Sequence, residues 1–120
     1  MNILHVDDEP DIREIVKLAL EMGGDTIVDS VPSGEAALDR IAAAAPDLVL
    51  LDVMMPGMSG PELKTRMNGC AAMRSIPVIF MTAAARAETK AELMALDARG
   101  VLEKPFDPMA LSADVHAMMG

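Results

Sequence analysis

Four apolar runs of this sequence end in residues that could take part in chemistry. Asp7 and Asp8 follow the first run, Asp52 stands near the end of another, and Thr82 and Lys104 close two more. If the runs are parallel strands of one sheet, their carboxyl ends meet at one edge, where open α/β sheets bind ligands. The sequence therefore predicts a crevice that brings three carboxylates, a hydroxyl and an ammonium together.

The charges in this crevice do not balance. The three aspartates, with Glu9 beside them, bring up to four negative charges against the single positive charge of Lys104. Carboxylates crowded in this way repel one another, so one would take up a proton unless a cation neutralised them. Oxygen ligands without His or Cys favour a hard ion, and Mg²⁺ suits a site built from two or three carboxylates. A magnesium site beside a lysine and a hydroxyl suits phosphoryl transfer, with Asp52 as the nucleophile.

The elements that must position these residues begin with five short apolar runs, which predict strands. Leu48–Leu51 is continuously apolar between two aspartates, as expected of a strand buried on both faces of a parallel sheet. Val101–Leu102 carries the least signal, because two apolar residues alone do not define a strand. The predicted strands are Ile3–Val6, Thr26–Val31, Leu48–Val53, Val78–Met81 and Val101–Leu102.

The stretches between these runs predict helices, because their apolar residues recur with helical spacing. Ser33 and Ser59 are good N-caps for the second and third of them. We expect Cys70 to lie on the apolar side of the third helix, the fourth helix to span Glu88–Ala98, and Pro108 to open the last one. Strands that alternate with helices indicate a parallel α/β sheet with right-handed crossovers, in one domain over residues 1–120.

Composition narrows the class of protein. A chain of 120 residues, 52% of them hydrophobic, can bury one core. The net charge of -9 repels phosphate backbones and anionic lipids, so we expect neither a nucleic acid nor a membrane as partner. Cys70 is the single cysteine, which excludes an internal disulfide. With no apolar run of membrane-spanning length and no signal peptide, we expect a cytoplasmic protein.

Four short motifs carry a resemblance to a known family. They are the acidic turn Val6–Glu9, the stretch Leu51–Gly60, the triplet Met81–Ala83 and the triplet Lys104–Phe106. In this order and spacing, the sequence resembles the receiver domain of two-component response regulators over its whole length. The resemblance implies a doubly wound, flavodoxin-like fold with a five-stranded parallel sheet in the order 2-1-3-4-5. It also implies a single receiver domain over residues 1–120 without an output domain, acting as a phosphoacceptor and not as an enzyme with turnover.

The resemblance assigns roles to the acidic residues. Asp52 corresponds to the phosphoacceptor, which takes a phosphoryl group from a phosphohistidine donor. Asp8, Asp52 and the backbone carbonyl of Met54 correspond to direct Mg²⁺ ligands, and Asp7 corresponds to a ligand that acts through water. The implied cofactor is therefore Mg²⁺.

The resemblance also assigns roles at the ends of the last two predicted strands. Lys104 corresponds to the lysine that pairs with the phosphoryl group, and its bond to Pro105 is cis in the family. Thr82 corresponds to the switch hydroxyl, and Ala83 to the small neighbour that leaves the site open. The position three residues before the lysine is usually Tyr or Phe, but here it is Val101. Valine is small and stiff at χ1, so we expect phosphorylation to be read out without the movement of a ring.

Ile12 and Ile15 stand at the edge of the inward stripe of the first predicted helix, near the acidic turn. From the residues alone, a wide core stripe and a docking patch explain them equally well. The resemblance implies that they and Glu9 dock a sensor histidine kinase or a histidine phosphotransfer protein. A downstream target protein would be a second partner, and we expect the chain to be a monomer.

Two other functions remain to be weighed against the phosphorylation switch. A phosphatase with an aspartate nucleophile would need an acid two residues after Asp52, where this chain has Met54. A degenerate receiver that serves only as a protein-interaction module would be expected to lack part of the acidic, hydroxyl and lysine set, which is complete here. His5 lies inside the first predicted strand, and we interpret it as a packed strand residue and not as a phosphoryl carrier.

Overall fold

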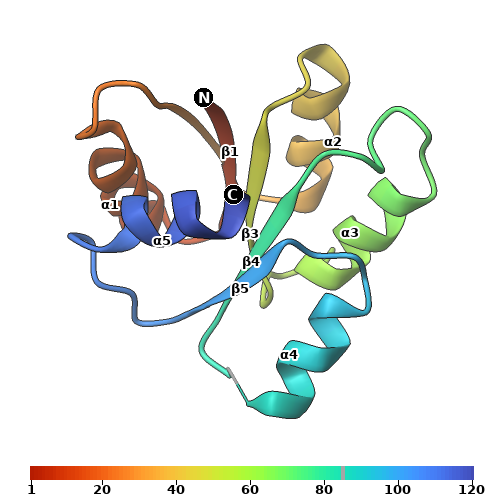
Figure 1. Cartoon of the computed structure of the whole chain (residues 1–120). Helices are drawn as coiled ribbons and strands as arrows, with labels where there is room; N and C mark the ends of the chain where they lie inside the picture. Colours follow the sequence, from red (N-terminus) through yellow and green to blue (C-terminus); the bar gives the residue numbers. More distant parts are fainter. Residues whose placement is uncertain (85) are drawn as a thin grey trace.

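The computed structural model describes residues 1–84 and 86–120. In this part of the chain, strands and helices alternate as the sequence predicts (Figure 1). The strands are β1 (Asn2–Val6), β2 (Ile27–Val31), β3 (Leu48–Asp52), β4 (Val78–Thr82) and β5 (Gly100–Glu103). The helices are α1 (Pro10–Glu21), α2 (Gly34–Ala43), α3 (Gly60–Asn68), α4 (Ala87–Met94) and α5 (Leu111–Met119).

The strands form one parallel sheet in the order β2-β1-β3-β4-β5, which confirms the predicted fold class. Every residue of β3 and β4 is buried, because both strands are flanked by other strands and covered on both faces. The register pairs Asp52 with Met81 and Thr82 with Glu103, so the polar strand ends reach one edge of the sheet. The short run that carried the least signal is a true strand, because β5 pairs along its length with β4.

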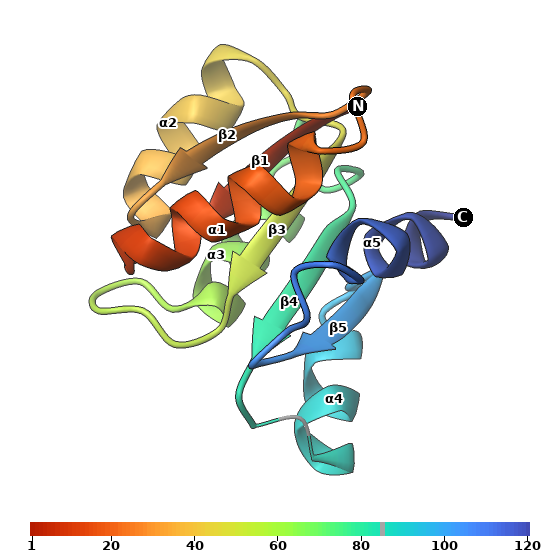
Figure 2. The same ribbon diagram turned by 90° about the vertical axis from the view of Figure 1, so that its left-hand side faces the viewer.

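Helices cover both faces of this sheet. Helices α1 and α5 lie on one face, which Figure 2 shows in front of the strands. Their buried residues join those of the strands in one cluster, which includes Val16, Leu20, Leu111 and Val115. Helices α2, α3 and α4 lie on the other face and contribute to a second cluster. The edge of the sheet that carries the polar strand ends therefore lies between two apolar layers, which hold the strands in place.

Two of the predicted helix caps are confirmed. Ser33 caps α2 and Ser59 caps α3, and each hydroxyl accepts a hydrogen bond from a backbone N–H three residues later. Both caps stand at the carboxyl-end side of the sheet, directly after the strand or loop that leads into the helix. They fix where α2 and α3 begin.

Three predicted helix boundaries are wrong. Helix α3 ends at Asn68, so Cys70 lies in the following turn and not on the helix. Helix α4 ends at Met94 instead of Ala98, because Asp97 adopts a positive φ of 68° that closes the helix with a tight turn. Helix α5 begins at Leu111, because Pro108 opens a turn in which the Asp107 carboxylate accepts a hydrogen bond from the N–H of Met109.

Gly60 is the position at which a helix approaches the polar edge most closely. A Cβ atom at Gly60 would lie 2.3 Å from the backbone oxygen of Asp52 and 3.0 Å from the Cα of Val53. Real Cβ atoms do not come so near to backbone atoms, so only glycine allows the first turn of α3 to pack against the end of β3. This contact fixes the backbone that carries Asp52.

We predict that Gly60→Ala lowers the free energy of unfolding by about 1–3 kcal/mol, the usual cost of overpacking a rigid site. Gly69→Ala, at the other end of α3, is the matched control, because its nearest neighbouring atom would be 3.6 Å from the new Cβ. Urea unfolding of both variants measures the difference. Equal stability of Gly60→Ala and Gly69→Ala would contradict the close approach.

Candidate functional site

The predicted acidic crevice exists at the carboxyl edge of the sheet. Asp7 and Asp8 follow β1, and Asp52 is the last residue of β3. One carboxylate oxygen of each lies within 4.8 Å of the others. Asp7 and Asp52 are buried and Asp8 is half-buried, so the cluster is largely removed from solvent. The carboxyl ends of two neighbouring strands, β1 and β3, bring these residues together, as expected for parallel strands.

Lys104 connects two of these carboxylates. Its Nζ donates hydrogen bonds to Asp52 Oδ1 at 3.0 Å and to Asp7 Oδ2 at 3.1 Å. The lysine follows β5, and its backbone N–H donates to the carbonyl of Thr82 at 2.8 Å, which anchors it to the end of β4. The bond to Pro105 is cis, in agreement with the sequence prediction. A residue 52 positions from Asp52 in the chain is thereby brought to its side.

The site contains more negative charge than one ammonium can balance. Burial raises the pKa of the Asp52 carboxyl above its ordinary value, Lys104 acts to lower it, and the charges of Asp7 and Asp8 add to the rise. Burial lowers the pKa of Lys104, but its hydrogen bond to Asp52 and the charges of Asp7 and Asp52 outweigh burial and raise it. Lys104 therefore stays charged, while the carboxylates attract additional positive charge.

The backbone holds the acidic turn in a defined geometry. Asp7 Oδ1 accepts a hydrogen bond from the N–H of Glu9 at 2.9 Å, and the carbonyl of Asp7 accepts one from Arg13 Nη1 at 2.8 Å. The N–H of Asp7 donates to the carbonyl of Val31 on β2. These bonds orient the Asp7 carboxylate before any ligand enters.

Thr82 stands at the end of β4 with its side chain buried. Its Oγ1 accepts a hydrogen bond from the N–H of Ala84 at 3.0 Å. A hydroxyl that accepts one bond keeps its hydrogen free to donate another. Ala83 is exposed beside it, so no bulky side chain covers the threonine there.

Met54 is the remaining residue that the sequence analysis assigned to the metal site. It lies in the loop after β3, and its side chain is 79% exposed. Its role is implied for the backbone carbonyl alone, and that role stays a prediction.

The sequence analysis missed the position of His5 relative to this site. As predicted, His5 is a packed residue of β1 with no exposed surface. Its Nε2 lies 3.8 Å from Asp7 Oδ2, however, so the ring lies directly beside one of the carboxylates of the site. Burial lowers the pKa of His5 from 6.5 to about 4, so the ring is neutral near pH 7. The signal was present in the sequence, since residues two apart in a strand point to the same face.

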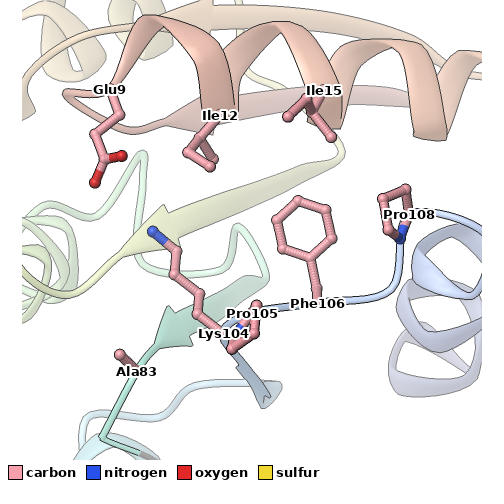
Figure 3. Close-up of a pocket in the computed structure, with 8 residues that line it drawn as sticks. All are labelled: Glu9, Ile12, Ile15, Ala83, Lys104, Pro105, Phe106 and Pro108. Carbon is pink, nitrogen blue, oxygen red and sulfur yellow. The ribbon is translucent and has the colours of Figure 1, made fainter.

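The residues predicted to dock a partner line one apolar pocket of about 380 Å³. Figure 3 shows Ile12 and Ile15 projecting from α1 toward the ring of Phe106, with Glu9 at the end near Lys104. Ile15 is 40% exposed, so it is not a core residue. Because Lys104 lines this pocket and also bonds Asp52, the apolar surface continues directly into the acidic site.

The donor set fits a hard divalent cation. Three carboxylates can each offer an oxygen, and among the described residues this is the group whose spacing suits a metal ion. A cation there would supply the positive charge that Lys104 alone does not. None of the helices in the described part of the chain is long and apolar enough to cross a membrane.

Known proteins resemble this chain in sequence and in overall structure. The phosphate regulon transcriptional regulatory protein PhoB of Pseudomonas aeruginosa is 38% identical over 98% of this chain and 51% of its own length. Chemotaxis response regulator CheY4 of Vibrio cholerae superposes with a TM-score of 0.90 at 31% identity, covering 98% of this chain and 97% of that one. A BeF3-activated DrrB receiver domain superposes with a TM-score of 0.83 at 28% identity, covering 98% and 96%.

The curated relatives are longer proteins, and the chain spans about half the length of PhoB and of the Synechocystis response regulator Rre1. Residues 3–116 match the family described as the response regulator receiver domain. A match that includes every strand end of the acidic crevice leaves one assignment: this chain belongs to the response regulator receiver domain family, the phosphoacceptor signalling domains of two-component systems.

Proposed function

We propose that Asp52 accepts a phosphoryl group from a phosphohistidine donor in a Mg²⁺-dependent reaction, and that the modified site signals to a partner or passes the group on. The observation that carries this proposal is the ammonium of Lys104, which lies 3.0 Å from Asp52 inside a cluster of three carboxylates. A nucleophile, a cation site and a fixed ammonium are what phosphoryl transfer to a carboxylate requires.

Asp8 and Asp52 would hold Mg²⁺ directly with the backbone carbonyl of Met54, and Asp7 would hold it through water. The bound ion would neutralise charge on the phosphoryl oxygens. A carboxylate oxygen of Asp52 attacks phosphorus, the P–N bond of the phosphohistidine breaks, and its electron pair returns to the ring nitrogen. A proton on the other ring nitrogen of the donor makes the leaving group a neutral imidazole. The ammonium of Lys104 turns from the carboxylates to the phosphoryl group, and the free hydrogen of the Thr82 hydroxyl is donated to a phosphoryl oxygen.

The apolar pocket supports docking of the phosphodonor at this site. Ile12, Ile15 and Phe106 offer an apolar surface that ends at Lys104, and Glu9 adds a charged rim. We propose that a sensor histidine kinase or a histidine phosphotransfer protein covers this surface in the cytoplasm. Apolar contact beside the acceptor would bring the donor imidazole to Asp52.

The complete set of site residues argues against the alternative of a degenerate receiver used only for protein interactions. The proposal is not one of an enzyme with turnover, because Asp52 is itself the acceptor. Slow self-catalysed loss of the phosphoryl group belongs to the same proposal. Neither Met54 nor Ala84, which flank the site, has a side chain that could hydrogen-bond an attacking water.

The first prediction tests the acceptor. Incubation with phosphoramidate and Mg²⁺ should raise the mass of the intact protein by one phosphoryl group, and chelation of the metal should abolish the increase. Asp52→Asn should not be labelled. Asp47→Asn, which changes the aspartate just before β3 and therefore far from the site, is the matched control and should be labelled like the parent. Labelling of Asp52→Asn at the parental rate would show that another residue is the acceptor.

The second prediction concerns the repulsion among the carboxylates. In the presence of a chelator, Asp52→Asn should raise Tm by about 4 °C, equivalent to roughly 1 kcal/mol for a domain of this size. The gain should shrink in excess Mg²⁺, because the parent then gains binding free energy that the variant partly loses. Thermal unfolding with and without Mg²⁺ measures both effects.

Asp39→Asn is the control for this measurement, because it removes the same charge from an exposed position on α2. Its Tm should change little and should not depend on Mg²⁺. A lower Tm for Asp52→Asn in chelator would mean that the lost hydrogen bond to Lys104 outweighs the repulsion.

The third prediction concerns readout. Val101 is half-buried against the core cluster, whereas Thr82 bonds the chain just before α4 through the N–H of Ala84. In phosphorylated Val101→Ala, amide chemical shifts over α4 should respond nearly as in the parent. In Thr82→Ala, phosphorylation should persist while the response of α4 is largely lost. If phosphorylation changed the amide shifts of α4 in Thr82→Ala but not in Val101→Ala, the proposed transmission through Thr82 would be wrong.

A further inference from the structure

His5 is a buried polar residue whose presence the packing of β1 does not explain. Its side chain has no exposed surface, and within the described residues neither ring nitrogen has a hydrogen-bond partner. Its strand neighbours include the apolar residues Ile3 on its own strand and Leu50 on β3, together with Ser30 on β2, whose hydroxyl is also buried without a partner. A buried polar group without partners costs free energy that an apolar side chain of the same size would not. Such a group needs an explanation beyond packing.

The geometry relates His5 to one atom of the acidic site. Its Nε2 lies 3.8 Å from Asp7 Oδ2, which is just beyond hydrogen-bond range. That oxygen already accepts the ammonium of Lys104 at 3.1 Å, while Asp7 Oδ1 accepts the N–H of Glu9. Asp7 Oδ2 therefore lies between two donors and is bonded to one of them.

The bond to Lys104 is the one that phosphorylation changes. The same ammonium bonds Asp52, so it must turn when a phosphoryl group is attached there. Asp7 Oδ2 would then be left as a buried carboxylate oxygen without its charged partner, which is costly. The imidazole of His5, whose Nε2 lies 3.8 Å from that oxygen, is a donor close enough to replace the ammonium if the side chains move together.

We propose that His5 is a positioning residue for Asp7: its Nε2–H donates to Asp7 Oδ2 when Lys104 turns to the phosphoryl group, and so keeps the carboxylate oriented toward the cation. This inference rests on the proposed function, because it requires that a phosphoryl group and Mg²⁺ bind at the acidic cluster. In this role the imidazole donates a hydrogen bond and transfers no proton. Neutral histidines that orient ligand carboxylates change metal affinity without touching the metal.

The experiment measures Mg²⁺ affinity in the presence of beryllofluoride, a stable analogue of the phosphoryl group. The chain has neither Trp nor Tyr, so amide chemical shifts are used as the signal. We expect His5→Leu to lower the affinity for Mg²⁺ about 10-fold, as for other residues that orient metal ligands. His5→Gln, whose amide nitrogen can occupy the place of Nε2, should recover most of this loss, and the shorter His5→Asn should not.

Stability separates this role from a merely structural one. His5→Leu replaces an unpaired buried polar group by an apolar one, so we expect its Tm to equal or exceed that of the parent. Ser30→Ala is the matched control. Ser30 pairs in register with His5 on β2 and also has a buried, unpaired hydroxyl, so it makes no hydrogen bond to Asp7. Its Mg²⁺ affinity should not change.

A spectroscopic readout tests the hydrogen bond itself. In ¹H–¹⁵N spectra of the His5 ring, the proton should reside on Nε2, and its resonance should move downfield when Mg²⁺ and beryllofluoride bind. A proton on Nδ1, or parental Mg²⁺ affinity in His5→Leu, overturns the inference while the proposed function stands. A parent protein that binds neither Mg²⁺ nor beryllofluoride overturns the proposed function and this inference with it.

Discussion

One ammonium shared by two carboxylates is the interaction on which the site depends. Lys104 bonds Asp7 and Asp52, which follow different strands, and it is itself supplied by a third. Without this positive charge, three carboxylate oxygens within 4.8 Å would repel one another and draw up a proton or a cation. The sheet order makes the arrangement possible. Strands β1 and β3 are neighbours, and β5, which leads to Lys104, pairs with β4 on the other side of β3. The negative charge of the carboxylates exceeds the single positive charge of Lys104, and this excess favours the binding of a cation at the site.

Much of the fold and of the site was predictable because both follow from short-range patterns. Apolar runs that end in Asp, Thr or Lys predicted strands and their functional ends together, since parallel strands collect their carboxyl ends at one edge. The motifs added the strand order and the cis bond before Pro105, which periodicity cannot supply. Even β5 followed from position in the alternation, although two apolar residues did not define it.

The errors have a common physical cause, which is that tertiary packing and turn chemistry set the ends of elements. The composition of Glu88–Ala98 is helical throughout, yet Asp97 takes a left-handed conformation and α4 stops at Met94. Pro108 is a good first residue of a helix, but the Asp107 carboxylate captures the next N–H in a turn. The nearness of His5 to Asp7 is an exception, because a spacing of two residues already places both side chains on one face of the strand.

The absence of an aromatic side chain at Val101 makes the backbone near Lys104 and Thr82 important for signalling. Both groups that would respond to a phosphoryl group are joined by a hydrogen bond from the N–H of Lys104 to the carbonyl of Thr82. The Thr82 hydroxyl is joined in turn to the N–H of Ala84, in the segment that leads to α4. If Thr82 donates its hydrogen toward the site, its oxygen moves, and the bond to Ala84 must lengthen or carry the segment with it. A change of one charge at the acidic cluster can therefore reach Ala84 through hydrogen bonds alone, without a rotating ring.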